Sequence, residues 1–248
     1  MKHFIIYKQP EGAQTPWKKE YTQDEISNLP DSSRLEFDVN RGGKSIPSLM
    51  NGKLAFLRET ANHRLFTFSG KGLARVKSKE ALYVERDFEL WQQKGGRLAA
   101  SIEGTRYISN CAVAFLSYST YRDSFMIKKS GLVKSDFIKL KNYVTNSSGE
   151  VTQALMHGIN NPELSFNVRD IYLKGSHLEN IRDFDEYLKA SDRIKTMGFV
   201  VRKEETRFSF RITHWGGGQI FSPQDPLDHE IAAFLNMLDQ VIGTGTVT

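Results

Sequence analysis

The sequence predicts an α+β protein with antiparallel sheets, flanking helices and two lobes. In the C-terminal half, predicted elements follow the order strand, helix, strand, strand, helix, which favours an antiparallel sheet. In the N-terminal half, apolar runs punctuated by glycines predict a hairpin. Hydrophobic residues make up 39% of the 248 residues, enough for a packed core. We expect a basic, β-rich lobe over residues 1–110 and an α+β lobe over residues 111–248.

In the N-terminal lobe, short apolar runs separated by turn residues predict a first strand and a hairpin. The strands fall at residues 4–8, 54–58 and 65–68, the last two about a turn at 61–63. Between the first two strands, Thr22 and Glu25 fit a capping box that would open a short helix ending near Pro30.

The segment 79–93 has two interpretations. Gly95 and Gly96 follow it directly and would close a helix, so we expect a helix here. A pair of strands is the alternative, because Tyr83 and Phe88 favour β-structure.

The C-terminal lobe shows the clearer periodicity. Apolar runs and alternating patterns predict strands at residues 112–118, 164–173, 199–201 and 208–212. The last two would flank a turn at 204–205. Ser135 fits the cap of a helix that carries Phe137 and Leu140, and apolar residues at helical spacing predict another helix over 178–188.

A final helix would begin at Asp225 and Pro226, with the acid as N-cap and the proline at the first helical position. We expect it to span residues 226–242. Its apolar stripe comprises Ile231, Phe234, Leu235 and Leu238.

Three consecutive glycines precede this helix, directly after Trp215. They are Gly216, Gly217 and Gly218, and they allow positive φ values. We expect a hinge that lets the final helix move or help to form a homodimer. A plain loop in a monomer is the alternative.

Charge is distributed unevenly along the chain. Residues 41–79 carry nine Lys or Arg and one acid, a net charge of +8 against +5 for the whole chain. Residues 94–141 carry +6, whereas 1–40, 80–93 and 144–248 are acidic. Such a field suits a polyanion, and double-stranded DNA is the first candidate. A solvated basic surface without a partner is the alternative.

We expect Lys and Arg side chains to bind DNA phosphates. The first set comprises Arg41, Lys44, Lys53, Arg64, Lys71, Arg75, Lys77 and Lys79. The second set comprises Lys128, Lys129 and Lys134. Phe66 and Phe68 alternate in a predicted strand, which favours a place in the core over stacking on bases.

The sequence contains no complete catalytic motif. The run Gly42-Gly-Lys-Ser45 lacks the upstream glycine of a phosphate-binding loop. The six histidines show no metal-ligand spacing, and the one cysteine, Cys111, lies beside a predicted apolar strand. We therefore expect no enzymatic activity, metal or cofactor. A metal-dependent nuclease using Glu36 and Asp38 is the alternative, although neither acid has the lysine two residues further on that such a site favours.

Location is constrained by two absences in the sequence. Apolar runs stay well below the ~18–20 residues that span a bilayer, and a single cysteine excludes an intrachain disulfide framework. We expect a cytoplasmic protein.

From residue 134 onward, the sequence resembles the RexA-type phage-exclusion proteins of lambda-like prophages. The similar pieces keep their order along the chain: Ser135-Asp-Phe137, Ser147-Ser-Gly-Glu150, Leu155-Met-His-Gly158, the start of a strand at Leu164, Phe199-Val-Val201 and Glu230-Ile-Ala232. The N-terminal half is similar only as a pair of strands followed by a basic segment.

The resemblance implies an α+β homodimer that binds double-stranded DNA with little sequence preference. It also implies a membrane-channel partner of the RexB type, and it carries no catalytic residues. The expected function is therefore that of a sequence-nonspecific DNA-binding protein of phage exclusion. A protein-interaction module with a basic face is the remaining alternative.

Overall fold

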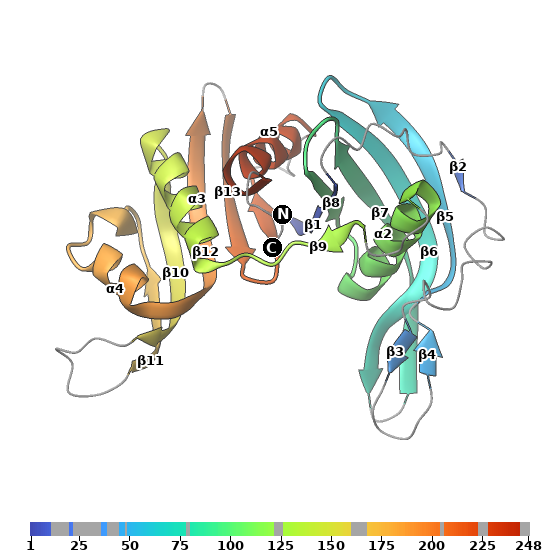
Figure 1. Ribbon diagram of the computed structural model, residues 1–248, viewed down its shortest axis with the longest axis horizontal. Helices are drawn as coiled ribbons and strands as arrows, with labels where there is room; N and C mark the ends of the chain where they lie inside the picture. The colour runs from blue at the N-terminus through green and yellow to red at the C-terminus, as the bar shows by residue number, and fades with distance from the viewer. Residues whose placement is uncertain are drawn as a thin grey trace. The chain divides into compact units, whose positions relative to one another are not determined.

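The computed structural model divides the chain into two compact units (Figure 1). It describes residues 1–10, 20–21, 36–38, 45–47, 49–77, 80–121, 126–159, 168–203, 206–222 and 228–243. The N-terminal unit comprises residues 4–129, and the C-terminal unit comprises residues 130–248 together with 1–3. The division thus falls after Lys129 rather than at residue 110, because the helix that begins at Arg106 packs on the N-terminal sheet. Both units combine antiparallel strands with helices, which confirms the α+β class.

Long antiparallel strands form the sheet of the N-terminal unit. In spatial order they are β1 (Lys2–Lys8), β8 (Leu98–Ile102), β7 (Glu80–Gln93), β6 (His63–Lys77), β5 (Leu49–Glu59) and β2 (Glu20–Tyr21). Two shorter pairings are those of β9 (Lys128–Lys129) with β1, and of β3 (Glu36–Asp38) with β4 (Ser45–Pro47). The hairpin predicted around residues 61–63 is confirmed. The helix predicted after Thr22 lies outside the described residues.

Helix α2 (Arg106–Tyr121) covers one face of this sheet. It buries apolar side chains at helical spacing, namely Ile108, Ala112, Val113 and Leu116. They pack against Phe66 and Phe68, both 0% exposed, so the core position predicted for these two rings is confirmed. The strand predicted at residues 112–118 is wrong, because the apolar run is one part of a helical stripe.

Residues 80–93 form the single strand β7, so the predicted helix is wrong. The strand pairs with β6 along its length and with β8 near its end. Phe88 and Leu90 of β7 are buried under α2. Glu85 and Asp87, which precede them in the same strand, are exposed. Pairing on both sides of β7 therefore outweighed the glycine signal for a helix end.

The C-terminal unit is a sheet with helices packed on one face. Its strands, in spatial order, are β11 (Val168–Lys174), β10 (Glu150–Ile159), β12 (Ser191–Lys203), β13 (Thr206–Thr213) and β14 (Gly217–Phe221). Its helices are α3 (Lys134–Asn146), α4 (Phe184–Ala190) and α5 (Asp228–Leu238), together with the short 3₁₀-helix η2 (Leu178–Asn180) and the π-helix η3 (Asp239–Gly243). Figure 1 shows α3 lying across β10 and β12.

Local signals in this unit explain two differences from the sequence prediction. The N-cap of helix α3 is Val133 rather than Ser135, and the Asp136 carboxylate at the third helical position accepts the Val133 backbone N–H at 3.0 Å. The helix expected over 178–188 is divided into η2 and α4, although Leu178, Phe184 and Leu188 are all buried as expected. Of the strand expected at 164–173, residues 168–174 form β11 and the rest lies outside the described residues.

The final helix packs on its own sheet. All four predicted stripe residues are at most 2% exposed, and the Phe234 ring lies 5.1 Å from that of Phe210 on β13. The apolar stripe therefore needs no second copy of the chain to cover it. The expected helix start at Asp225 lies outside the described residues.

The glycine run forms a hairpin turn. Gly216 adopts a φ of 79° and donates its N–H to the Thr213 carbonyl at 3.0 Å. Gly217 and Gly218 belong to β14, where a Cβ on Gly217 would overlap the Trp215 ring. Of the three glycines expected to form a hinge, Gly216 thus lies in a tight turn and Gly217 and Gly218 begin β14, which stands between that turn and α5.

Candidate nucleic-acid interface

Only part of the first predicted set of DNA-binding residues can be placed. Arg41, Lys44 and Lys79 lie outside the described residues. Arg75 and Lys77 belong to β6, but their side chains are not described. Lys53 of β5 and Lys71 of β6 are exposed, and Arg64 of β6 is half-buried.

The pairing of β6 with β7 sets acids beside these bases. Lys71 stands opposite Glu85, and Lys77 stands opposite Glu80. Lys53 is opposite Ser69 on β6, which is in turn opposite Asp87 on β7. Since paired residues of antiparallel strands project to the same side, the Glu85 carboxylate stands beside Lys71. Residues 80–93 carry a net charge of −3 and so offset part of the +8 of residues 41–79.

Arg64 is likewise engaged within the unit. Its Nε lies 3.8 Å from Glu59 Oε1, and the Lys94 ammonium forms an ion pair with the same oxygen. The structure therefore does not gather Lys53, Arg64 and Lys71 into a surface of purely basic character.

The second predicted set divides in two. Lys128 and Lys129 form β9, and Lys128 stands opposite Lys8 of β1. Burial, followed by the nearby Arg106 charge, lowers the pKa of Lys129 to about 8. Lys134 instead donates its ammonium to the carbonyls of Lys189 and Ser191, at 2.6 and 2.7 Å, and so ties α3 to the end of α4.

The sheet of the C-terminal unit has an inner face under the helices and an opposite face, which we name the outer face. Phe199 and Phe210 stack at 4.9 Å on the inner side, beneath α5. Because side chains alternate along a strand, their neighbours Val200, Ser209 and Arg211 project to the outer face.

Basic side chains gather on the outer face. Following the alternation and the register from β11 to β13, they are Lys174, Arg193, Lys195, Arg202, Arg207 and Arg211. Among the residues that the structure describes, the acids on the same face are Asp170 of β11 and Glu150 of β10. Six described bases thus stand against two described acids, although the sequence from 144 to 248 is acidic overall.

The remaining described acids of this unit lie mainly in its helices and turns. They include Glu179, Asp183, Asp185, Glu186, Asp228, Glu230 and Asp239. The unit is therefore basic on its outer face and acidic among its helical elements.

Each acid of the outer face is held by bases. Asp170 Oδ1 lies 2.7 Å from Lys195 Nζ and 2.9 Å from His157 Nδ1. These two hydrogen bonds, with Lys195 the stronger influence, lower the pKa of Asp170 to about 2.

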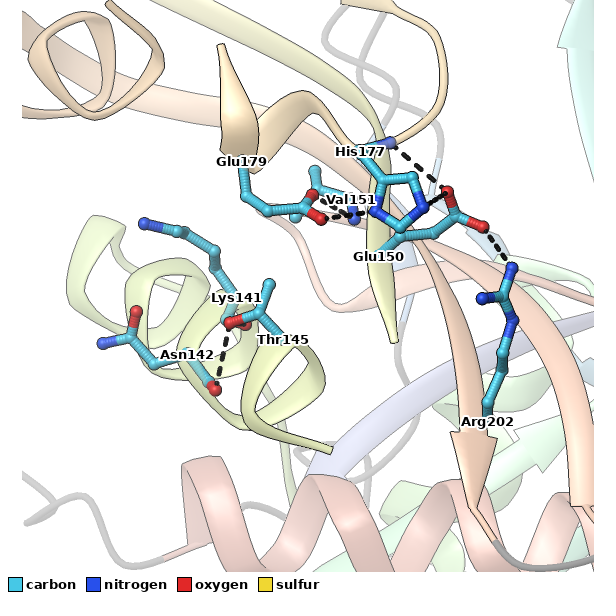
Figure 2. A network of polar contacts seen from close by, with 8 residues as sticks. All are labelled: Lys141, Asn142, Thr145, Glu150, Val151, His177, Glu179 and Arg202. Atoms are coloured by element: carbon cyan, nitrogen blue, oxygen red, sulfur yellow. Dashed lines mark hydrogen bonds and ion pairs between the residues drawn. The ribbon is translucent and has the colours of Figure 1, made fainter. Parts of the chain in front are cut away.

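Glu150 is the centre of the second network, shown in Figure 2. Its Oε1 lies 2.8 Å from Arg202 Nη2, and its Oε2 lies 3.4 Å from His177 Nε2. On its other side, His177 Nδ1 contacts Glu179 Oε1 at 3.0 Å, and Glu179 Oε2 accepts the Val151 backbone N–H at 2.8 Å. His177 is thus fixed between two carboxylates in a left-handed conformation, with a φ of 52°.

Three bases of the outer face keep their charge available. Lys174, Arg193 and Arg207 are exposed, and their side chains form no hydrogen bond or ion pair with the residues that the structure describes. They come from β11, β12 and β13, so they are spread across the face. This is the arrangement that contacts to several phosphates require.

The outer face cannot be found by counting charge along the chain, because alternation and register decide which side chains share a face. The signal was present as period-2 alternation in β13, where Arg207, Ser209 and Arg211 alternate with buried Phe208 and Phe210.

The nuclease alternative stays a prediction. Glu36 and Asp38 belong to β3, but their side chains, like that of Cys111 in α2, are not described. Within the described residues, no three His, Cys, Asp or Glu side chains are grouped to hold a metal ion. In the same part of the chain, no helix combines the length and apolar character needed to cross a membrane.

The sequence matched none of the protein-family models and none of the curated proteins with which it was compared.

Proposed function

We propose that this protein binds double-stranded DNA through its phosphates, without sequence preference, and that the outer face of the C-terminal unit is the principal contact surface. The observation that carries the proposal is that, within the described part of the sheet, six bases are grouped with two acids on one side. Arginine and lysine contacts to phosphates release counterions and do not depend on base sequence.

A second basic cluster supports contact with a long polyanion. Around β9 in the N-terminal unit, Lys128 stands opposite Lys8 of β1, and Lys129, which projects to the other face, lies near Arg106 at the start of α2. Burial beside another cation disfavours the charged form of Lys129, and a phosphate nearby would favour it again. Lys128 and Lys129 therefore remain in the proposed DNA-binding set, whereas Lys134 serves to join α3 to α4.

The biological setting is proposed from the resemblance to RexA-type proteins. The similar segment begins near residue 134, so it coincides with the unit that holds the outer face. We place the DNA binding in phage exclusion, with the chain as a cytoplasmic homodimer that acts with a RexB-type membrane channel. The homodimer must use a surface other than the α5 stripe, because that stripe is buried within its own unit.

Salt-dependent binding tests the proposal. Gel-shift titrations with two unrelated duplexes of equal length should give the same affinity. The logarithm of the binding constant should fall with the logarithm of salt with a slope of roughly −4 to −7, for four to eight phosphate contacts. Strong preference for one duplex, no dependence on salt, or no binding at ~50 mM salt would each contradict it.

A further inference from the structure

The outer face contains a depression between three neighbouring strands. Its volume is about 400 Å³, within the range of small-ligand sites. The lining residues are Val200, Arg207, Phe208, Ser209, Phe221 and Ser222. The register places Val200, Ser209 and Phe221 side by side across β12, β13 and β14, so these three side chains form its floor.

The floor combines apolar surface with one hydroxyl group, that of Ser209. Val200 and Phe221 are only partly buried, so an apolar side chain and an aromatic ring face the depression. The Ser209 hydroxyl forms no hydrogen bond with the described residues. The Ser222 hydroxyl does not belong to the floor, because Ser222 Oγ donates to Glu230 Oε1 of α5 at 3.0 Å, on the inner side of the sheet. A flat, partly polar ring is the shape and chemistry that such a surface accepts.

Charge at the rim indicates an anionic group on the same ligand. Arg207 stands directly opposite Arg202 across β12 and β13, an arrangement that destabilises a sheet when both charges are uncompensated. Glu150 compensates Arg202, because Glu150 Oε1 lies 2.8 Å from Arg202 Nη2. Figure 2 shows this ion pair. Arg207 has no such partner among the described residues, so one positive charge remains at the rim of the depression.

We propose that this depression binds one unstacked nucleotide, with its base against Phe221 and its phosphate at Arg207. An aromatic floor stacks on any base, and an exposed arginine binds phosphate in a bidentate manner. The inference deepens the proposed function and rests on it, because the depression lies on the same outer face. A base paired within a duplex cannot reach the floor, so the ligand is an unpaired nucleotide of a DNA strand or a free mononucleotide.

Calorimetric titration of the full chain with three probes tests the site. Thymidine 5′-monophosphate should bind at least tenfold more tightly than thymidine or inorganic phosphate, because each of these lacks half of the contacts. Arg207→Gln should weaken nucleotide binding about tenfold and leave thymidine binding unchanged. Equal affinity for the nucleotide and for phosphate would overturn the proposal, as would absence of nucleotide binding.

Two further variants separate the depression from the rest of the outer face. Ser209→Trp should fill the floor and abolish nucleotide binding. Arg193→Gln removes an equally exposed base of the outer face that does not line the depression. It should weaken duplex binding and leave nucleotide binding unchanged; loss of nucleotide binding in this control would overturn the assignment to the depression.

The source of the nucleotide is distinguished by a single-stranded oligothymidylate of about eight nucleotides, within the usual site size of single-strand binding proteins. Tighter binding of the oligonucleotide than of the monophosphate supports a DNA strand as the ligand, and the reverse order supports a free nucleotide. If duplex binding is intact but no nucleotide binds, the depression is wrongly assigned and the proposed function stands. If the nucleotide binds and duplex DNA does not, the nucleotide site is supported and the proposed function is wrong.

Discussion

Strand β6 of the N-terminal unit and strand β13 of the C-terminal unit both carry basic side chains, yet their neighbours differ. β6 pairs with the acidic strand β7, so Lys71 is opposite Glu85. β13 pairs with β12, so Arg207 is opposite Arg202 and the excess charge stays on one face. Segment 41–79 has the higher positive charge in the sequence. Its described residues nevertheless form a less basic surface than those of the outer face.

This difference shows that register and side-chain direction decide where a sheet protein is basic. Antiparallel pairing joins segments that follow each other in sequence, so a basic segment followed by an acidic one is offset across a hairpin. Alternation then separates the remaining charges between two faces. The net charge of a segment such as 41–79 or 144–248 contains neither the pairing between strands nor the face to which each side chain projects.

The largest effect is expected from Phe234→Ala, which tests whether the C-terminal unit closes its own inner face. Phe234 is 0% exposed and contacts the rings of Phe208 and Phe210. Its truncation should lower the free energy of unfolding by about 3–5 kcal/mol, measured by urea denaturation. Tyr172→Ala, at a ring of the outer face that is 55% exposed, is the control and should cost less than about 0.5 kcal/mol. A small loss at Phe234, together with reduced self-association, would instead place the stripe at a dimer interface.

The next largest effect concerns DNA affinity. Replacing Lys174, Arg193 and Arg207 together by Gln should lower the affinity for duplex DNA on the order of 10²-fold or more at about 0.1 M salt. The salt slope should become less steep by about 3, one for each lost phosphate contact. All three side chains are exposed, so the free energy of unfolding should hardly change.

The matched triple variant belongs to the N-terminal unit. Arg58, Lys53 and Lys71 are exposed bases that already take part in interactions within the chain. Their replacement by Gln changes the net charge by the same amount. The resulting fold-loss of duplex affinity should be at least ten times smaller than that of the outer-face variant. A larger loss of affinity in this variant than in the outer-face variant would contradict the proposal. It would indicate that the principal contact surface lies in the basic segment 41–79.

Much of the fold could be predicted from local pattern. The strand at residues 4–8, the hairpin about 61–63 and the strands about 204–205 follow from apolar runs between turn residues. The helix predicted at 79–93 and the strand predicted at 112–118 are wrong, because each prediction considered one segment without its neighbours. β7 is specified by pairing on both sides, and α2 by a stripe longer than the apolar run.

The candidate site could be predicted less well than the fold. Lys128 and Lys129 were found from charge alone, and the structure does place them beside other bases. The outer face depends on the register that brings β11, β12 and β13 together, which no single strand contains. The role of Lys134 depends on the carbonyls at the end of α4, which are distant from it in sequence.

A smaller effect is expected from His63, and it reports on the N-terminal unit alone. His63 begins β6, is 1% exposed and has its ring 5.7 Å from that of Trp91 on β7. Burial, and then the Lys94 charge, lowers its pKa to about 4. Between pH 6.5 and 4 the unfolded chain binds a proton that the folded chain does not, so stability falls as pH falls through this window.

The corresponding measurement is urea denaturation at pH 7 and pH 5. The unit should lose about 1–2 kcal/mol through His63 between these values. His63→Phe should remove that part of the loss and leave the contribution of other groups. Identical pH dependence in both proteins would show that His63 is not buried beside Trp91, and the β6–β7 register behind the comparison would then be in doubt.

The smallest effect is a gain of affinity on removing an acid from the outer face. Asp170→Asn frees Lys195, which the Asp170 carboxylate holds at 2.7 Å. Because the pKa of Asp170 is lowered to about 2, the wild-type carboxylate is charged at every pH above about 4, and the variant differs from it by one full charge there. Duplex affinity should rise severalfold and the salt slope should steepen by about 1.

Asp185→Asn is the matched control, since Asp185 of α4 also pairs with a lysine, Lys141, but on the helical side of the same unit. It makes the same change in net charge and should leave the salt slope as it is. Equal gains in the two variants would mean that only net charge matters, whereas a gain confined to Asp170→Asn would locate the phosphate contacts on the outer face.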